Sequence, residues 1–498
     1  MRTSSTPITR RRSILGGLAA ATVIGWSTSH QAWARESDSF AHTAASLPAL
    51  DGTLETSAGV TSTFNHDFGH MVTGACWAVL RPGSVRDIVK MVDYARAHRL
   101  KIAMNGRGGQ NGDEESHSCY GQAQVPQGGI AIDARGLTKI VRIGSSSAVV
   151  EAGVTWAQLT DAALARGLTP PALTDYLHLS IGGTLSVGGI GSTVARYGLQ
   201  IDTVKSLDIV TGNGDLITAS PHCHAALFNT ALGGGGQVGI IVRAEVALIP
   251  APPKMTVFTL YYNDVSAFLA DSEKLMAEKR FEGQVGEIAR TPDDSGWWYK
   301  LEGQAYWRGG TAPDRTALLT GLHDERASAT IEDLPFREAV FRTDGDEAWL
   351  KENDFWGQPK PWLSLFVPAS KAKAFADLLT AELNGDDLGA GFLLYYPYPT
   401  SKVTRPLAVQ PSEPTAYLCD VLRFPAPGAD IDRMLDQNRR LYDKAVALGA
   451  KRYLVGAIPD MTPADWRAHF GIRWKVLVAA KRRYDPAGIL TPGQGFFG

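Results

Sequence analysis

The segment Thr174–Gly191 reads TDYLHLSIGGTLSVGGIG, and it decides how the rest of the chain is interpreted. One carboxylate, Asp175, stands before a run of glycines interleaved with Ser and Thr. Glycines let a flat ring lie against the backbone, hydroxyl groups donate hydrogen bonds to phosphate or ring oxygens, and an aspartate can accept a proton. An Asx turn would explain the aspartate but not the length of the small-residue run. This pattern predicts an active site with Asp175 as the proton acceptor.

Two further glycine-rich segments flank this one. Asn105–Gly109 (NGRGG) directly follows a predicted strand at Ile102–Met104, and such a turn can form an anion-binding nest for a pyrophosphate, with Arg107 adding charge. It is not a GxGxxG motif that opens a helix, so a Rossmann NAD site is not supported. Leu232–Ile241 (LGGGGQVGII) indicates backbone that passes close to a flat ligand or to another strand. Each segment alone also fits an ordinary turn or a flexible connector.

Histidines occur in two other motifs. His117–Gln122 (HSCYGQ) places an imidazole near the predicted nest, where it could bond a flavin methyl carbon, although a lone histidine is more commonly an ordinary polar residue. Pro221–His224 (PHCH) lacks a third and a fourth ligand nearby, so we expect a surface loop and no metal site.

Composition excludes several classes of protein. The chain has 498 residues, of which 44% are hydrophobic and 20% charged, as in a soluble globular protein of two to four domains. Lys and Arg number 49 against 51 Asp and Glu, so there is no basic excess for nucleic-acid binding. Four scattered cysteines without a CxxC pair argue against a disulfide framework, a zinc ribbon or an iron–sulfur cluster. HExxH is absent, and so is GxSxG in a strand–turn–helix context.

The N-terminus is typical of an export signal. Arg10–Arg12 precede the apolar stretch Ile14–Trp26, which is too short to span a bilayer, and Ala32–Ala34 (AWA) offers small residues for cleavage. The twin arginines predict a Tat signal over residues 1–34, and hence a periplasmic or secreted protein with no membrane span. A basic N-terminal anchor is the alternative. Because the Tat route carries folded proteins, it also favours a prosthetic group.

Strands and helices alternate over residues 75–155, and Gly212–Asp215 (GNGD) predicts a hairpin. Ile240–Ile249 is predicted as one long strand, and Pro250–Pro253 (PAPP) as a stiff break. Residues 254–452 combine aromatic-rich alternating strands with amphipathic helices near 264–278, 368–383 and 430–447. The predicted fold class is α+β, with an antiparallel sheet covered by helices on one face.

Several segments resemble the cytokinin dehydrogenases, members of the vanillyl-alcohol-oxidase superfamily with a PCMH-type FAD-binding domain. The matching stretches cover nearly all of the chain after the signal: AVLRPGSVRDIVKMV, TDYLHLSIGGTLSVGGIGSTVARYGLQIDTVKSLDIVTGNGDLITASP, LFNTALGGGGQVGIIVRAEVALIPAP, WGQPKPWLSLFVP, LLYYPYP and HFGIRWKVLVAAKRRYDPAGILTPGQ. The resemblance implies a two-lobed FAD-binding domain, formed by residues 36–252 and 453–498, and a substrate or cap domain over residues 253–452.

The resemblance also implies site residues. The following residues are expected to contact FAD: Asn105, Gly106, Arg107, Gly108, His117, Ser118, Gln122, Asp175, Ser180, Ser186, Ile190, Ile241, Tyr453, Thr491 and Gln494. His117 is expected to bond covalently to the flavin 8α carbon, and Asp175 to act as the catalytic base.

The chain departs from the family pattern at three places. Eight residues, Gly109–Ser116 (GQNGDEES), separate Gly108 from His117, where relatives have no break. The insertion either bulges outward and leaves both flanks in place, or puts Gly109 at the histidine's position, so that FAD is held non-covalently. A longer surface loop costs little free energy, which favours the bulge. Leu173 replaces a tryptophan, which could reshape the substrate slot.

The third departure concerns the substrate side. Ser364 and Asp420 stand where relatives carry other polar residues, and Asp346 or Glu347 is expected to be the cap acid that meets the substrate. The expected reaction is oxidation of a secondary amine, an N6-alkenyladenine, with hydride transfer to flavin, giving adenine and an aldehyde. A quinone-type acceptor or oxygen would reoxidise the flavin. The alternatives are an FAD-linked alcohol or sugar oxidase on the same scaffold and a non-catalytic flavin- or ligand-binding protein.

Overall fold

The computed structural model describes residues 23–110, 115–125, 128–490 and 492–498, and the chain forms two compact units, Met1–Leu47 and Pro48–Gly498. In the first unit, β1 (Val23–Ser27) pairs with β2 (Ala32–Arg35) and with β3 (Ala45–Ser46). The twin arginines of the predicted export signal lie outside the described residues. Everything below concerns the second unit.

The first sheet of this unit delivers the NGRGG segment. Its order is β4 (Thr53–Glu55), β5 (Ala78–Arg81), β7 (Gly129–Asp133), β6 (Lys101–Asn105), with β5 and β6 both parallel to β7. Helix α2 (Val85–His98) connects β5 to β6 and buries its predicted apolar stripe, including Ile88 and Val92. Because β6 ends at Asn105, the glycines follow at the carboxyl end of a parallel strand, where ligands bind in α/β sheets.

The second sheet is antiparallel and five-stranded. Its strands, in spatial order, are β12 (Leu216–Ala219), β11 (Val204–Thr211), β13 (Gly239–Ala247), β9 (Ser147–Glu151) and β8 (Ile140–Ile143). The Gly212–Asp215 hairpin is confirmed. A capping box at Thr155 opens α3 (Trp156–Leu164). The strand predicted over Ile240–Ile249 instead ends at Ala247. Beyond it, β14 (Ile249–Pro250) pairs with β10 (Leu168–Thr169).

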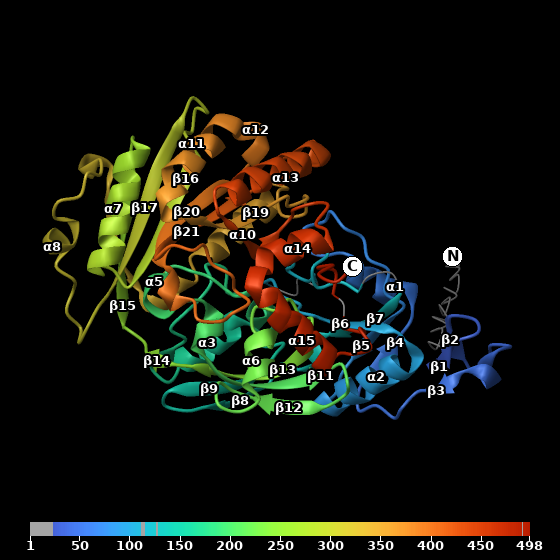
Figure 1. Ribbon diagram of the computed structural model, residues 1–498. Helices are drawn as coiled ribbons and strands as arrows, with labels where there is room; N and C mark the ends of the chain where they lie inside the picture. The colour runs from blue at the N-terminus through green and yellow to red at the C-terminus, as the bar shows by residue number, and fades with distance from the viewer. Residues whose placement is uncertain (1–22, 111–114, 126–127, 491) are drawn as a thin grey trace, which may run out of the picture. The chain divides into compact units, whose positions relative to one another are not determined.

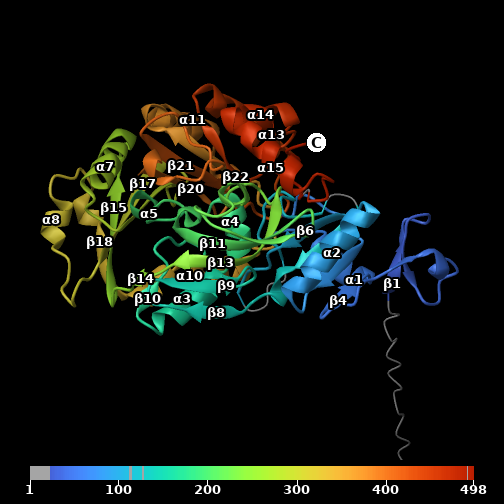
Figure 2. The ribbon, with the colours of Figure 1, turned by 60° about the horizontal axis from the view of Figure 1, so that its bottom comes forward.

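The middle of the quoted segment forms a short helix. Helix α4 (Ile181–Val187) lies against β13 and against β22 (Lys451–Gly456), as Figure 2 shows. Asp175 lies at a bend in the irregular stretch that precedes it. The chain therefore brings its glycine-rich backbone between two sheets.

The third sheet has eight strands, and all neighbouring pairs are antiparallel, which confirms the predicted α+β class. Its order is β18 (Thr330–Pro335), β15 (Lys254–Tyr262), β17 (Trp297–Tyr306), β16 (Gly283–Arg290), β20 (Phe392–Pro399), β21 (Thr415–Leu422), β19 (Leu363–Pro368) and β22. Three predicted helices are confirmed on one face: α7 (Val265–Glu278), α11 (Ala372–Glu382) and α13 (Ile431–Ala447) (Figure 1).

Strand alternation gives the third sheet two different faces. Leu365, Tyr395 and Cys419 pack in the core under the helices. Their neighbours Tyr396 and Leu418 instead join the core of the five-stranded sheet. Side chains of β20 and β21 on this second face therefore point toward the glycine-rich segments. No helix in the described part of the chain is long and apolar enough to cross a membrane.

Candidate active site

A cavity of about 750 Å³ lies where the end of β6, α4, β13 and the second face of the eight-stranded sheet meet. Its size suits a large organic cofactor together with a small substrate. Most of the predicted site residues line it: Gly106, Gly108, His117, Ser118, Gln122, Asp175, Ser180, Ser186, Ile241, Asp346, Glu347, Tyr453 and Gln494. Residues separated by up to 388 positions in the sequence thus share one site.

Other predicted residues do not line the cavity: Asn105, Arg107, Ile190, Ser364 and Asp420. The predicted Thr491 lies outside the described residues. The guanidinium of Arg107 lies 4.2 Å from the centre of the Phe64 ring and donates to the Thr63 carbonyl at 3.0 Å. The guanidinium therefore contacts Thr63 and Phe64 and does not line the cavity.

The nest end of the cavity fits a cofactor that brings its own polar atoms and needs close contact with backbone. Asn105 is fully buried, yet neither Oδ1 nor Nδ2 has a hydrogen-bond partner among the described residues. Leaving such a group unpaired is costly, and Asn105 stands directly before Gly106, which lines the cavity. A Cβ at Gly106 would fall 2.0 Å from Ser180 Oγ, and Gly235 and Gly236 adopt left-handed φ values of 62° and 71°. These features fit the pyrophosphate and ring of FAD.

The flanks of the insertion lie side by side. The Gly108 N–H donates to the Glu115 carbonyl at 3.3 Å, and a Cβ at Gly108 would lie 3.5 Å from His117 Cδ2. His117 lines the cavity, whereas Gly109 does not. This geometry is what the bulge interpretation predicts; residues 111–114 lie outside the described residues.

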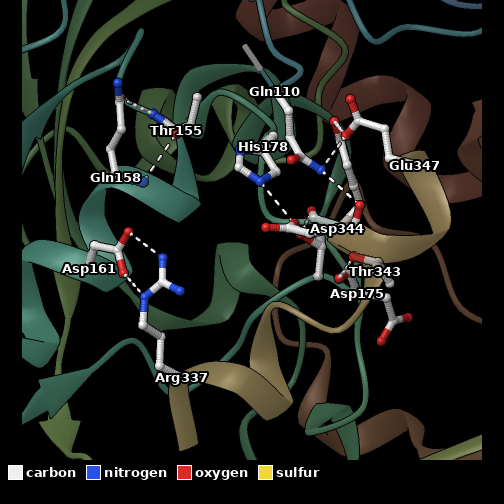
Figure 3. Close-up of polar contacts among 12 residues, drawn as sticks. Gln110, Thr155, Gln158, Asp161, Asp175, His178, Arg337, Thr343, Asp344 and Glu347 are labelled. Carbon is white, nitrogen blue, oxygen red and sulfur yellow. Dashed lines mark hydrogen bonds and ion pairs between the residues drawn. The ribbon is translucent and has the colours of Figure 1, made fainter. Parts of the chain in front are cut away.

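Asp175 has a charged partner that the sequence analysis missed. Arg342 Nη2 donates to Asp175 Oδ1 at 2.9 Å and lies 3.6 Å from Glu302 Oε1. The Thr343 hydroxyl donates to the Asp175 carbonyl at 2.9 Å (Figure 3). Burial raises the pKa of Asp175, Arg342 opposes that rise, and the charge of Glu302 adds to it. A raised pKa makes this carboxylate a stronger base.

Helix α10 (Thr343–Glu352) forms one wall of the cavity and is tied to Gln110 and His178, which come from distant parts of the sequence. Gln110 Nε2 donates to Glu347 Oε2 at 2.9 Å and to the Asp344 carbonyl at 3.3 Å, and His178 Nε2 lies 3.0 Å from Asp344 Oδ1 (Figure 3). Gln110 belongs to the insertion, so the extra loop contacts the helix that carries the predicted cap acids.

Glu347 is the most heavily bonded of these acids. The Tyr176 hydroxyl donates to its Oε2 at 2.5 Å, and Lys351 Nζ lies 2.6 Å from its Oε1. Burial alone would raise the pKa of Glu347, but the hydrogen bonds from Lys351, Tyr176 and Gln110 outweigh it and lower the pKa. The group is therefore an anion at neutral pH.

Asp420 and Ser364 face each other across β21 and β19, directly behind the cavity wall. Asp420 shares its face with Leu394 and Leu422, which do line the cavity. Burial raises the pKa of Asp420 to about 7, and the charge of Asp175 adds to this rise. Asp420 Oδ1 has no hydrogen-bond partner among the described residues.

Further charged residues in the cavity were missed at the sequence level: Glu287, Lys300, Glu302 and Arg342. Lys300 and Glu302 alternate on β17, and Glu287 on β16 pairs with Lys300. The alternation of Lys300 and Glu302 within an aromatic-rich strand was a usable signal. Arg342 carried none, because only the fold brings it to Asp175.

Comparison with known proteins gives consistent similarities. A family model described as "Cytokinin dehydrogenase 1, FAD and cytokinin binding" matches residues 282–497, and one described as "FAD binding domain" matches residues 77–220. Cytokinin dehydrogenase 6 of Oryza sativa subsp. japonica is 32% identical, over 92% of this chain and 93% of its own. An uncharacterized oxidoreductase from the fasciation locus of Rhodococcoides fascians is 37% identical, over 86% of this chain and 95% of its own.

Among solved structures, 6-hydroxy-D-nicotine oxidase from Arthrobacter nicotinovorans superposes with a TM-score of 0.68 at 20% identity, covering 90% of this chain and 98% of its own. At that identity the likeness concerns the fold.

Proposed function

Because the chain belongs to the cytokinin dehydrogenase family of FAD-dependent oxidoreductases, we propose that it oxidises the secondary amine of an N6-alkenyladenine. Water then hydrolyses the imine that this oxidation leaves, and the products are adenine and the corresponding aldehyde. FAD, when bound, accepts the hydride that leaves the carbon next to the amine nitrogen. A quinone-type acceptor or oxygen then takes the electrons.

The observation that carries this proposal is the state of the Asp175 carboxylate. Arg342 occupies Oδ1, and no group among the described residues donates to Oδ2, while the side chain retains 24% exposure toward the cavity. Oδ2 can therefore accept the hydrogen bond of a substrate N–H and then its proton. Loss of that proton raises the electron density at nitrogen and favours departure of the hydride.

Other residues would bind and orient the substrate. The Glu347 anion and Asp346, both on α10, face the cavity and suit the N–H groups of a purine. Leu394, Leu422 and Trp362 supply apolar surface for a flat ring and an alkenyl chain. We also propose that His117 holds FAD covalently, since it lines the cavity next to the Gly108 nest. Export through a Tat signal stays a prediction.

The runner-up function is oxidation of an alcohol or sugar, in which Asp175 would deprotonate a hydroxyl group. The charged groups Glu287 and Lys300 in the cavity lining favour it, because a hydroxylated ligand would form hydrogen bonds with such groups.

A substrate panel with a dye acceptor tests the proposal. The purified holoprotein should reduce the dye with isopentenyladenine, and should release adenine and an aldehyde in equal amounts, but should not reduce it with alditols or aryl alcohols. Reduction by the hydroxyl compounds alone would establish the runner-up. Acid precipitation tests the covalent link: yellow pellet supports it, and yellow supernatant contradicts it.

A further inference from the structure

We propose that Phe68 and Tyr176 form an aromatic clamp that orients the His117 ring for covalent attachment to FAD. The inference rests on the proposed His117 link and adds the two residues that position it. Neither residue carries chemistry of its own in the step, so both are positioning residues.

The three rings form a parallel stack. The Phe68 and His117 centroids are 4.8 Å apart with an angle of 6° between the planes, and the His117 and Tyr176 centroids are 5.5 Å apart with an angle of 7°. Both faces of the imidazole are therefore covered. A reacting partner can approach only through the edge of the ring, where both nitrogens lie and where the unprotonated one holds its in-plane lone pair.

The Phe68 side of the clamp is rigid. Phe68 is 3% exposed and contacts Trp356 at 4.8 Å and Trp362 at 5.6 Å between centroids. Lys360 Nζ lies 4.4 Å from the centre of the Phe68 ring, and the electron density of the ring face attracts this cation. The ring cannot turn without disturbing this cluster.

The backbones of Phe68 and His117 are also joined. The Phe68 N–H donates to the Ser116 carbonyl at 2.8 Å. Asp67 Oδ2 accepts from the Ser118 hydroxyl at 2.8 Å and from the Gly121 N–H at 2.7 Å. The segment that carries His117 is thus fixed on both sides of the histidine, although an eight-residue insertion precedes it.

The Tyr176 side is held through its hydroxyl, which donates to Glu347 Oε2 on α10. Tyr176 also follows Asp175 directly, so the same backbone positions the base and the clamp. A change at position 176 can therefore affect the stacked ring and the neighbouring carboxylate together.

The step that the clamp serves is balanced as follows. One bond forms between a His117 ring nitrogen and the flavin 8α carbon. The imidazole N–H and one methyl C–H bond break. The flavin takes up the two electrons and two protons that are released, so it is reduced by two electrons. Dioxygen reoxidises it and becomes hydrogen peroxide. In-plane approach matters because the nitrogen lone pair must point at the carbon.

The experiment compares variants of the holoprotein that differ in ring shape but little in volume. Phe68→Met and Tyr176→Met keep apolar bulk and lose the flat face. Tyr176→Phe keeps the face and loses only the Glu347 hydrogen bond, so it is the matched control. His117→Ala gives the amount of acid-insoluble flavin that remains when no covalent link can form. The readouts are acid-insoluble flavin, flavin fluorescence on a denaturing gel and the mass of the intact chain.

We expect the natural protein and Tyr176→Phe to retain nearly all flavin in the acid pellet. Both Met variants should release most of it to the supernatant, with at least a fivefold fall in the covalent fraction, while still purifying yellow. Phe68→Tyr keeps a flat ring at position 68 and should retain the covalent flavin. Comparing it with Phe68→Met distinguishes loss of the ring face from general damage to the fold.

Fully covalent flavin in both Met variants would overturn the clamp while leaving the His117 link intact. Covalent flavin in His117→Ala, or acid-soluble flavin in the natural protein, would overturn the link and the clamp together. None of these outcomes decides amine oxidation, which the substrate panel measures separately. If a Met variant does not fold, failure of Phe68→Tyr and Tyr176→Phe to remain covalent still contradicts the clamp.

Discussion

At the scale of single residues, the central feature is a carboxylate kept basic by its surroundings. Asp175 is half-buried beside one cation, Arg342, which also lies close to the anion Glu302. Arg342 binds one carboxylate oxygen and fixes the orientation of the other, which is the arrangement that the proposed catalytic base requires.

We expect Asp175→Asn to bind FAD normally but to reduce it about 100-fold more slowly or worse, since a positioned base contributes roughly 10²- to 10⁴-fold. Stopped-flow absorbance with isopentenyladenine measures the rate. The control is Asp161→Asn, which breaks an exposed ion pair with Arg337 outside the cavity (Figure 3) and should leave the rate unchanged. A normal rate in Asp175→Asn would remove this residue from the mechanism.

Asp420 should make stability depend on pH. Its pKa rises from 3.8 to about 7 on folding, so the folded state binds the proton more tightly than the unfolded state. This contribution to the free energy of unfolding is fully present below the pKa that Asp420 has in the unfolded chain. It is lost as pH rises toward 7, by up to about 1.4 kcal/mol per pH unit.

We therefore expect Asp420→Asn to lose less stability than the natural protein between pH 4.5 and 8, with a gain of about 1–3 kcal/mol at pH 8. Thermal unfolding across this range measures it. Asp436→Asn, at an exposed position on α13, serves as the control and should run parallel to the natural protein. Parallel curves for Asp420→Asn would show that the carboxylate is solvated.

At the scale of elements, the turn after β6 has room for glycine but not for a residue with a side chain. A Cβ at Gly108 would lie 2.2 Å from the His178 carbonyl oxygen, closer than packed atoms tolerate. We expect Gly108→Ala to weaken the free energy of FAD binding by about 1–3 kcal/mol, which lowers the affinity roughly 5- to 150-fold.

FAD titration in a His117→Ala background, where binding is reversible if the proposed link holds, measures this affinity. Gly59→Ala in α1 (Ala58–Thr61) is the control, because a Cβ there meets open space. Equal affinities for the two variants would contradict the proposed nest.

Helix α10 is the second element with a specific expectation. Gln110→Ala removes two hydrogen bonds that tie the insertion to Asp344 and Glu347. The amides of residues 343–352 should then exchange with deuterium faster, because local opening costs less free energy. Gln158→Ala instead disrupts the capping box of α3 and should loosen that helix alone. Unchanged exchange in α10 would mean that the insertion does not hold it.

At the scale of the whole molecule, FAD should act as a structural link. The cavity is lined by the β6 turn, by α4 and β13, by the eight-stranded sheet and by Gln494 near the C-terminus. A ligand that contacts all of them stabilises the folded state by mass action, by about 2.7 kcal/mol at 100 times its Kd.

Flavin-free His117→Ala protein should therefore unfold at lower urea than the same protein refilled with FAD. Intrinsic fluorescence and circular dichroism follow the transition, and riboflavin, which lacks the pyrophosphate, should restore less stability than FAD. Identical midpoints with and without FAD would exclude this role.

The fold class and most of the site could be predicted because their signals are local. Hairpin, capping-box and helix patterns depend on residues only a few positions apart, and the run from Asp175 to Gly191 has few structural explanations. The strands β16 and β18 were not predicted, since Gly283–Arg290 contains two glycines and three charged or amide residues and Thr330–Pro335 is largely exposed. Their pairing partners, rather than their own composition, make them strands.

By itself, the sequence predicted a glycine-lined site with one aspartate in an α+β chain, and its resemblance to a known family predicted FAD at that site. The tertiary structure alone decided which groups surround that aspartate and the histidine. Arg342 reaches Asp175 across 167 positions, Glu347 reaches Tyr176 across 171, and Phe68 stacks on His117 from an earlier loop. Such contacts leave no local pattern, because a charge or a ring acts through space and only the packing of distant elements sets the distance.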